Sequence, residues 1–195
     1  MAAKVLLPFG ITSQIPIGLI IAMLLVISAP HFMYASVFFS EGCAKFFSKN
    51  HQLFMSLSKF LKYMLIIGML IIGFGVYKKS FTGLSMIDLA GACLFLFGLH
   101  LNILVYNLLG QKGVYYGMEL RAIKVDKWVT GYPFSFFPHP QYLGSIMNWW
   151  AFCCFTGFDE KGIPRWDVIA LTAYATLLYL FTMAKESNLR VKLKL

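Results

Sequence analysis

Residues 5–40 read V-L-L-P-F-G-I-T-S-Q-I-P-I-G-L-I-I-A-M-L-L-V-I-S-A-P-H-F-M-Y-A-S-V-F-F-S, and they include no Asp, Glu, Lys or Arg. A helix needs about 20 predominantly apolar residues to cross the hydrocarbon core of a bilayer. We therefore expect a transmembrane helix over 15–39. The apolar run is longer than the core of a cleavable signal peptide, so we expect it to stay in the protein.

The composition of the whole chain indicates the same class of protein. Of the 195 residues, 59% are hydrophobic and 13% are charged, and the mean hydropathy is +0.71. Such a chain is too apolar for a soluble domain of this length. Four more apolar stretches follow, at 57–77, 86–109, 142–158 and 166–184. These stretches predict a single all-α domain over 1–195, a membrane bundle of four to five transmembrane helices.

The last two stretches are separated by a short segment with Gly, Pro and charged residues, so they are predicted to form a hairpin. At about 1.5 Å per residue the stretch 142–158 would span about 25 Å, slightly less than the roughly 30 Å core of a bilayer. It therefore either crosses a thin part of the membrane or forms a re-entrant hairpin with 166–184.

The net charge of +9 raises the question of a nucleic-acid partner. The basic residues lie in short segments beside the apolar stretches, which is the placement that membrane orientation and anionic head groups favour. We therefore exclude nucleic acid as a partner. If all five stretches cross, twelve of the 17 basic residues share a side with the loop 110–144 and the C-terminal tail. The positive-inside rule then places that loop and the C-terminus in the cytoplasm.

The polar connector between the first two stretches carries His51, which we expect to be solvated. Lys59 and Lys62 fall within the start of the second stretch, so their side chains are expected to extend to the membrane interface. The four cysteines form no C-x-x-C pair, and small buried side chains explain them better than metal ligands or disulfides. No metal site is predicted.

Small and polar residues recur along one side of the third stretch and beyond it, at steps of three or four. They are Gly98, Asn102, Tyr106, Gly110, Gly113 and Gly117. At about 100° per residue they stay within about 120° of one helix face. For Gly98 alone, close helix packing explains the residue as well as a ligand site does. The amide, the phenol and the glycine-rich end together favour a polar groove that holds a ligand.

The loop that follows carries side chains that a membrane span has no need of. Residues 128–145 read W-V-T-G-Y-P-F-S-F-F-P-H-P-Q-Y-L-G-S. Pro140 stiffens the turn, Tyr142 supplies a ring with a hydroxyl donor, and Gly144 lets a ligand approach the backbone. Glu186 is predicted at the same level of the last stretch, where its carboxylate suits ribose hydroxyls or a cationic group. A plain ion pair with Lys185 or Arg190 is the alternative.

Four segments, taken in order, resemble the small integral-membrane phospholipid N-methyltransferases, and they are most similar to the plant-type enzymes. The segments are L-L-G-Q-K-G-V-Y-Y-G (108–117), W-V-T-G-Y-P-F (128–134), H-P-Q-Y-L-G-S-I-M (139–147) and the A-K-E-S that ends at Ser187. They cover roughly the C-terminal half, and the first two apolar stretches match only in hydropathy. The resemblance implies S-adenosylmethionine as methyl donor, mono- and dimethylated phosphatidylethanolamine as substrates in the bilayer, and the endoplasmic reticulum as location.

The resemblance and the helix pattern together give a set of expected site residues. The cofactor is expected to contact Gly98, Asn102, Tyr106, Gly110, Gly113, Tyr116, Gly117, His139, Pro140, Tyr142, Gly144, Glu186 and Ser187. His139 or Glu186 is expected to assist removal of the proton from the lipid amine. Two departures stand out. Many members carry paired glutamates where this chain has Glu186 and Ser187, and a glycine pair of some members is Gly91-Ala92-Cys93 here.

The pattern His-Pro-x-Tyr-x-Gly is also similar to the isoprenylcysteine carboxyl methyltransferases and the membrane sterol reductases. Those families usually place Arg before the His, whereas this chain has Pro138. The segments V-Y-Y-G and W-V-T-G-Y-P-F favour the phospholipid enzymes. A non-catalytic lipid-binding or scaffold protein is the alternative from another class, and it leaves the loop 110–144 unexplained.

Overall fold

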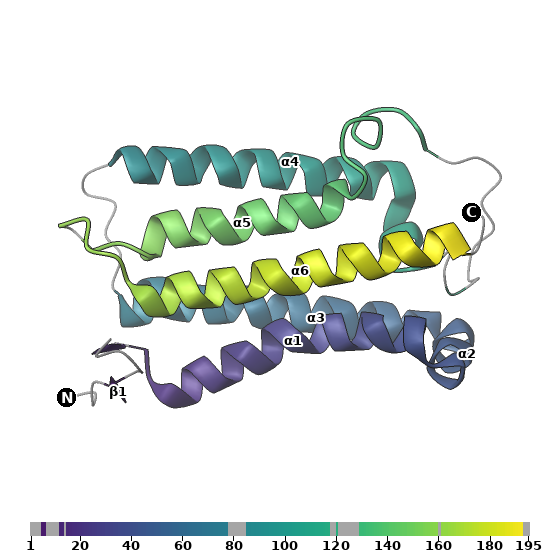
Figure 1. Ribbon diagram of the computed structural model, residues 1–195, viewed down its shortest axis with the longest axis horizontal. Coiled ribbons are helices and arrows are strands. Elements are labelled where there is room, and N and C mark those ends of the chain that lie inside the picture. Colours follow the sequence, from purple (N-terminus) through teal and green to yellow (C-terminus); the bar gives the residue numbers. More distant parts are fainter. Residues whose placement is uncertain are drawn as a thin grey trace.

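The computed structural model (Figure 1) describes residues 5–6, 12–13, 15–77, 85–117, 120, 129–159 and 161–192, without the side chains of 5–6, 12–13 and 187–192. Five long helices lie side by side in it: α1 (Ile17–Phe39), α3 (His51–Leu70), α4 (Met86–Val114), α5 (Pro140–Thr156) and α6 (Trp166–Lys192). The π-helical segment η2 (Ile71–Val76) continues α3. The strands β1 (Val5–Leu6) and β2 (Thr12–Ser13) form a short antiparallel pair before α1. The predicted all-α membrane bundle is confirmed.

Four helical segments of the described part are long and apolar enough to cross a membrane, judged by length and composition. They are Ile17–Phe39, His51–Val76, Met86–Val114 and Trp166–Glu186. The helix α5 has 17 residues and lies alongside α4 and α6 (Figure 1). Large apolar side chains point outward from the bundle, among them Leu25, Leu96 and Leu177, each 65% exposed. Such a surface suits hydrocarbon and not water.

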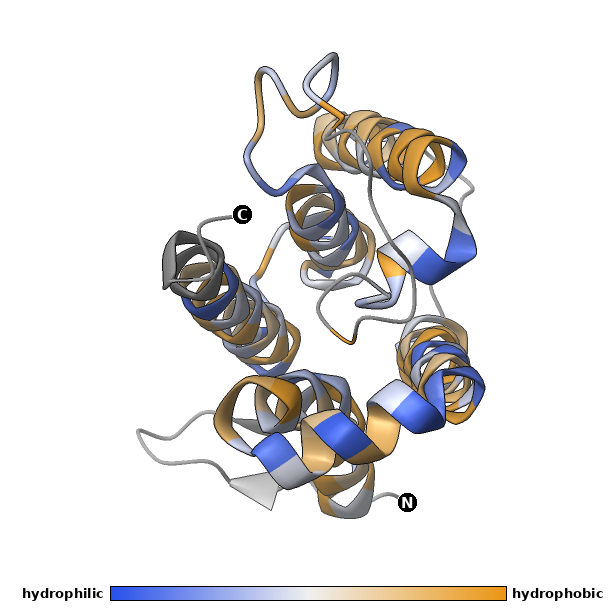
Figure 2. Ribbon diagram, turned by 90° about the vertical axis from the view of Figure 1, so that its right-hand side faces the viewer, coloured by the Kyte–Doolittle hydropathy of each residue, from blue (hydrophilic) through white to orange (hydrophobic). Residues whose placement is uncertain are grey.

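The predicted polar connector between the first two stretches is helical, which corrects its expected form. The helix α2 (Glu41–Lys49) begins at Ser40, whose hydroxyl accepts a hydrogen bond from the Cys43 amide, and α3 begins at His51. Figure 2 shows α2 lying across one end of the bundle with hydrophilic and hydrophobic faces. An amphipathic helix with lysines on its polar face suits a membrane surface. A search for apolar stretches does not find such a helix, because its polar and apolar residues balance each other.

His51 also differs from the expectation. His51 is buried, and its Nε2 lies 2.8 Å from the carbonyl oxygen of Tyr115. It therefore joins the start of α3 to the end of α4 instead of facing solvent. Lys62 is half-buried on α3, with its ammonium 4.8 Å from the centre of the Tyr115 ring.

The helix α4 begins with a reciprocal capping box. The Ser85 hydroxyl accepts from the Asp88 amide, and the Asp88 carboxylate accepts from the Ser85 amide at 3.1 Å. This arrangement satisfies amides that the first turn of a helix leaves without partners. It fixes where α4 starts at the end of the bundle opposite to α2.

Glycines bring α4 and α5 into close contact. A Cβ at Gly98 would lie 2.6 Å from the carbonyl oxygen of Gly144, and a Cβ at Gly144 would lie 2.6 Å from that of Gly98. Gly91 makes a similar approach, because its Cβ would lie 2.9 Å from the Cβ of Cys154. Small residues allow membrane helices to pack backbone against backbone. The two helices therefore form a unit, while α1 packs against α3 and α6.

Hydrogen bonds between side chains join α1 to α6. The hydroxyls of Ser28 and Tyr174 lie 2.6 Å apart, and His31 Nδ1 lies 2.8 Å from Thr182 Oγ1. Near the end where α6 begins, the Tyr77 hydroxyl donates to the Asp167 carboxylate at 2.5 Å. The Arg165 guanidinium lies 4.1 Å from the centre of the Tyr77 ring. These contacts fix η2 to the start of α6.

The arrangement of the helices predicts which segments share a side of the membrane. The helix α2, the end of α4 and the end of α6 lie at one end of the bundle, and the turn between α5 and α6 lies at the other (Figure 1). In a background without the four native cysteines, Lys45→Cys and Lys112→Cys should react with an impermeant maleimide from one side. Lys161→Cys should react from the opposite side only. Labelling of all three from one side would show that α5 and α6 do not both cross.

Several of the basic residues on which the predicted membrane orientation depends lie outside the described residues. They are Lys4, Lys78, Lys79, Arg121, Lys124, Lys127 and Lys194.

The glycine contact predicts a loss of stability when a methyl group is added to it. Gly98→Ala places its Cβ 2.5 Å from Asn148 Oδ1, and such overpacking costs about 1–3 kcal/mol. Gly18→Ala in α1 is the matched control, because a Cβ there meets no atom within 4 Å. Its helix should be unchanged or gain about 0.5–1 kcal/mol. The unfolding midpoint in detergent, followed by tryptophan fluorescence, should fall for Gly98→Ala only. Equal midpoints would contradict the close packing of α4 and α5.

Candidate active site

The end of α4 turns sharply at Gly110. Gly110 has φ 66° and ψ 173° inside α4, a left-handed conformation that glycine adopts without the steric penalty of a Cβ. The chain beyond this point changes direction, so Gly113 and Gly117 do not continue the face that carries Gly98 and Tyr106. The predicted single face of six residues is therefore wrong. Tyr116 also has a positive φ, 57°, and such outliers gather at functional sites.

The turn brings the Tyr116 side chain against α1 and α3, where aromatic rings surround it. Its ring centre lies 4.9 Å from that of Tyr34 and 5.4 Å from that of Phe38, both on α1. Phe54 of α3 packs edge-on at 6.1 Å. Aromatic pairs at these distances add to the energy of burial. Tyr116 is 6% exposed, so its hydroxyl is held in one place by α1 and α3.

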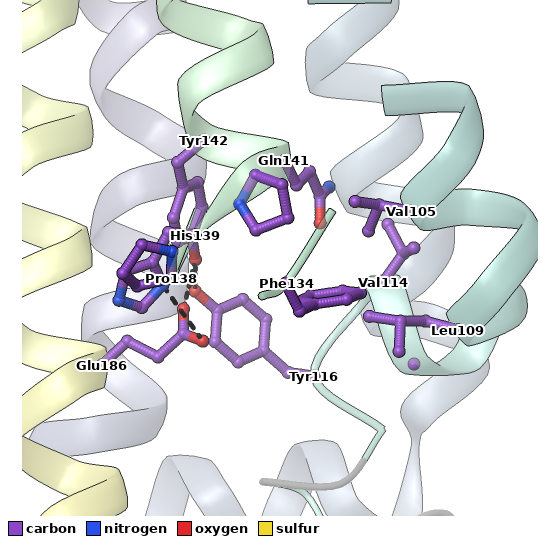
Figure 3. A pocket seen from close by; sticks show the side chains of 12 residues that line it. Val105, Leu109, Val114, Tyr116, Phe134, Pro138, His139, Gln141, Tyr142 and Glu186 are labelled. Atoms are coloured by element: carbon purple, nitrogen blue, oxygen red, sulfur yellow. Dashed lines mark hydrogen bonds and ion pairs between the residues drawn. The ribbon is translucent and has the colours of Figure 1, made fainter. Parts of the chain in front are cut away.

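This hydroxyl belongs to a chain of contacts between four polar side chains (Figure 3). Tyr116 and Tyr142 share a short hydrogen bond between their hydroxyls, and Tyr142 donates to Glu186 Oε2 at 2.8 Å. His139 Nδ1 lies 3.9 Å from Glu186 Oε1. The four residues come from the end of α4, the start of α5 and the end of α6, so three segments distant in sequence converge. We call these residues the polar cluster.

The polar cluster lies at the N-terminus of α5. His139 is the residue before that helix, Pro140 is its first residue and is buried, and Tyr142 lies in the first turn. Proline fits the first helical position because its missing amide hydrogen has no partner there. The N-terminus of a helix carries partial positive charge, which favours a nearby carboxylate. The side chains of His139 and Glu186 are only 8% and 7% exposed, so this charge acts with little screening by water.

Two cavities adjoin the polar cluster, and a third lies beside the second. The first, the loop cavity, has a volume of about 50 Å³, and its walls include Gly113, Tyr116, Phe134, His139, Tyr142 and Glu186. The second, the aromatic cavity, has a volume of about 40 Å³, and its walls include His31, Tyr34, Lys62, Tyr116, Tyr142 and Tyr179. The third, the α3–α4 groove, is larger, about 320 Å³, and contacts Lys62, Ile66, Asn102, Tyr106, Ser145 and Trp149. Tyr116 and Tyr142 separate the first cavity from the second.

The structure gathers some of the expected site residues and separates others. Gly113, Tyr116, His139, Pro140, Tyr142 and Glu186 all line the loop cavity. Asn102 and Tyr106 line the α3–α4 groove instead. Gly98 and Gly144 lie in the contact between α4 and α5, so we assign them to helix packing and not to the cofactor. Gly110 forms the bend, Gly117 is buried after it, and the side chain of Ser187 lies outside the described residues.

Several residues at the site carried no recognised signal in the sequence. Tyr34 and His31 come from α1, where the sequence indicates only an apolar span, and Lys62 comes from α3, where it was expected at the membrane interface and not at a site. Tyr179 was detectable, because Tyr179, Thr182 and Glu186 follow one another at steps of three and four. Such spacing places side chains on one face of a helix. That face of α6 is the one directed at α1 and at the polar cluster.

Comparison with known proteins agrees with this reading of the C-terminal half. The family model described as phospholipid methyltransferase matches residues 86–189. A phosphatidyl-N-methylethanolamine N-methyltransferase of Arabidopsis thaliana is 40% identical over 92 residues, 47% of this chain and 48% of the relative. A phosphatidylethanolamine N-methyltransferase B of Dictyostelium discoideum is 42% identical over 60 residues, 31% of this chain and 30% of the relative. No solved structure matches the chain significantly.

The match covers α4, α5 and α6, which supply all four residues of the polar cluster. The chain spans about half the length, or less, of these curated relatives, and α1 to α3 lie outside the matched segment. The segment 86–189 is more than half of the 195 residues, and the chain belongs to the phospholipid methyltransferase family.

Proposed function

We propose that the protein transfers methyl groups from S-adenosylmethionine to the amine of ethanolamine phospholipids, with mono- and dimethylated phosphatidylethanolamine as substrates and phosphatidylcholine as product. The observation that carries this proposal is the polar cluster, a buried carboxylate between a histidine and a tyrosine that is itself hydrogen-bonded to a second tyrosine. It lies between a cavity on the loop side and a cavity lined by aromatic rings. Family membership and the names of the relatives support the same reaction.

The donors of the loop cavity suit S-adenosylmethionine. The Glu186 carboxylate matches ribose hydroxyls or the positive charge of a sulfonium, and Gly113 leaves room for close approach to the backbone. Pro140 and Tyr142 form the wall toward α5. The cavity, about 50 Å³, is smaller than a nucleoside. We therefore infer that Phe134 and Pro138, on the loop wall of the cavity, move outward when the cofactor enters.

When bound, the cofactor supplies a methyl group that is already activated by its sulfonium, so the protein is left with alignment and proton removal. A protonated ethanolamine-type amine must lose its proton before it can act as a nucleophile. His139 and Glu186 lie 3.9 Å apart and are the bases within the polar cluster. Tyr142 fixes one carboxylate oxygen of Glu186, which keeps the other directed toward the imidazole.

The aromatic cavity suits the head group of the lipid. Tyr34, Tyr116, Tyr142 and Tyr179 contribute to its wall, and aromatic faces attract methylated ammonium groups. The attraction persists as methyl groups replace N–H donors, because it depends on charge and not on hydrogen bonds. One cavity of this kind serves successive methylation steps.

The nearest alternative from the sequence was a carboxyl methyltransferase, whose substrate group is an anion. An anionic substrate would face the buried Glu186 carboxylate, and like charges in a water-poor site repel each other. A cationic amine is favoured by the same charge. The position of Glu186 therefore supports an amine acceptor over a carboxylate acceptor.

We also propose a cytoplasmic position for the end of the bundle that holds the polar cluster, and an endoplasmic reticulum membrane for the protein. The orientation is supported by the basic residues at that end, which include Lys45, Lys49, Lys112 and Lys185. A water-soluble cofactor would then reach the loop cavity from the cytoplasm, while the lipid stays in the bilayer. The organelle rests on the resemblance to the phospholipid enzymes.

The role of Glu186 is testable by removal of its charge. Glu186→Gln deletes a charge-assisted hydrogen bond worth about 1.5–3 kcal/mol, which corresponds to about tenfold to a hundredfold in affinity. Calorimetric titration with S-adenosylhomocysteine should show this loss. Glu41→Gln is the matched control, because Glu41 has a 93% exposed side chain on α2, and its affinity should equal that of the wild type. Unchanged affinity in Glu186→Gln would remove Glu186 from the cofactor site.

The whole activity is tested by mass spectrometry of lipids after the purified protein is incubated with S-adenosylmethionine and each of three substrates. Unmethylated, monomethylated and dimethylated phosphatidylethanolamine should be compared in one detergent. Formation of phosphatidylcholine from the last two supports the proposed reaction. Binding of S-adenosylhomocysteine without any product would refute it, and absence of binding would favour a scaffold or a reductase.

A further inference from the structure

Lys62 is a cation within a membrane helix, and the family match does not include it, since the match begins at residue 86. It lies on α3 within the candidate span His51–Val76. Among the described residues, no carboxylate forms an ion pair with its ammonium; the cation–aromatic contact with Tyr115 at 4.8 Å is of another kind. Ionisable residues inside membrane spans are rare, and most of them mark pathways or sites for polar substrates.

Lys62 lines the α3–α4 groove, and its ammonium lies over the ring of Tyr115, which lines the same groove. The groove has a volume of about 320 Å³, which is within the range of small-molecule sites. It separates α3 from α4, because α3 packs against α1 while α4 packs chiefly against α5. Figure 2 shows α3 and α4 on the same flank of the bundle, apart from each other. The groove therefore opens sideways, toward the hydrocarbon.

The rim and the floor of the groove differ in polarity. On the rim, Ile66 and Tyr106 are 51% and 46% exposed at the outer surface of the bundle. Asn102 and Ser145 contribute polar groups deeper between the helices. An apolar rim with polar groups inside suits a molecule that is apolar at one end and charged at the other.

Lys62 also lines the aromatic cavity, together with Tyr116 and Tyr142. The groove and the aromatic cavity share seven lining residues, which are Lys62, Leu65, Val114, Gln141, Ser145, Trp149 and Tyr179. A molecule that enters through the groove thus passes Lys62 before it reaches the polar cluster. In a phospholipid the same order holds, because the acyl chains are followed by the phosphate and then by the amine.

We propose that Lys62 binds the phosphodiester of a phospholipid that enters sideways between α3 and α4. The assignment rests on the proposed function for the identity of the amine, but the phosphate contact follows from the groove and from the Lys62 ammonium, which forms no ion pair among the described residues. An ammonium repels the amine of the lipid and attracts its phosphate, so the head group is oriented with the amine toward Glu186. Lys62 is thereby a substrate-binding residue, and the positive charge selects lipids that carry phosphate.

The test compares Lys62→Met with Lys62→Arg and with Lys59→Met in the full-length protein in detergent. Lys59 lies one turn earlier on α3 and lines none of the three cavities, so it is the matched control. Two binding measurements are made for each variant: native mass spectrometry with phosphatidylcholine and with diacylglycerol, and calorimetry with S-adenosylhomocysteine. Methyl transfer to monomethylated phosphatidylethanolamine is measured separately as kcat and KM.

Loss of one charge-assisted contact should weaken phosphatidylcholine binding about tenfold in Lys62→Met and raise KM about as much, with kcat changed less. Binding of diacylglycerol, which has no phosphate, should not change, and neither should the affinity for S-adenosylhomocysteine. Lys62→Arg should restore most of the phosphatidylcholine binding, and Lys59→Met should match the wild type. The wild type should itself prefer phosphatidylcholine over diacylglycerol, a comparison that needs no folded variant.

Equal phosphatidylcholine binding and KM in Lys62→Met and wild type would overturn the assignment of Lys62, with the proposed reaction unaffected. If Lys62→Met instead lowers the affinity for S-adenosylhomocysteine, Lys62 binds the carboxylate of the cofactor. That result would also overturn the assignment of Lys62 to the phosphate. If the wild type transfers no methyl group but Lys62→Met loses phosphatidylcholine binding, the proposed reaction is wrong and the phosphate site stands. A wild type without preference for phosphatidylcholine over diacylglycerol refutes the phosphate site directly.

Discussion

A carboxylate cannot be buried at the end of a membrane helix without partners, and this constraint orders the whole C-terminal half of the protein. An ionised group loses several kcal/mol of hydration when it leaves water, and Glu186 is 5% exposed. Tyr142 supplies a hydrogen bond, His139 lies opposite the second oxygen, and the N-terminus of α5 adds partial positive charge. These partners lie at the N-terminus of α5, which must therefore begin beside the end of α6 that carries Glu186. The close glycine contact then fixes α4 to α5, and the bend at Gly110 returns Tyr116 to the same point.

Much of this arrangement was predictable from the sequence, for physical reasons that apply to any membrane chain. Backbone groups in hydrocarbon must pair within a helix, so the apolar stretches predicted the helices α1, α3, α4, α5 and α6 and the all-α bundle. The residues 139–142 and Glu186 were predicted as neighbours from their motif and their common level in the membrane, and the structure does bring them together. Their contact with a cofactor stays a prediction. The turn residues between α5 and α6 were equally clear, since Gly and Pro interrupt the apolar pattern.

The rest depended on contacts that no local pattern encodes. The amphipathic helix α2 has too little net hydropathy to stand out, and the burial of His51 is decided by the Tyr115 carbonyl, 64 residues away. Gly110 fits a helical spacing as well as its neighbours do, and only the left-handed φ of 66° shows that the face ends there. Gly98 and Gly144 contact each other, and a side chain on either would clash with the backbone of the other. They are 46 residues apart in the sequence, so spacing along one helix does not reveal this contact. From its position near the start of a span, Lys62 was expected at the membrane interface. Its surroundings in the structure depend on the separation of α3 from α4, which the sequence does not reveal.

The shared wall between the loop cavity and the aromatic cavity has a consequence for inhibitor design. Val114, Tyr116, Gln141 and Tyr142 line both spaces, so the two are separated by side chains and not by backbone. If the loop cavity holds the cofactor and the aromatic cavity holds the lipid head group, as we propose, a single compound with a nucleoside analogue at one end and a phosphoalkyl chain at the other would occupy both cavities at once. It would lose its translational and rotational freedom only once for two sets of contacts, which is the basis of gains in affinity by linkage. The best linker would be short, because only side chains lie between the two cavities.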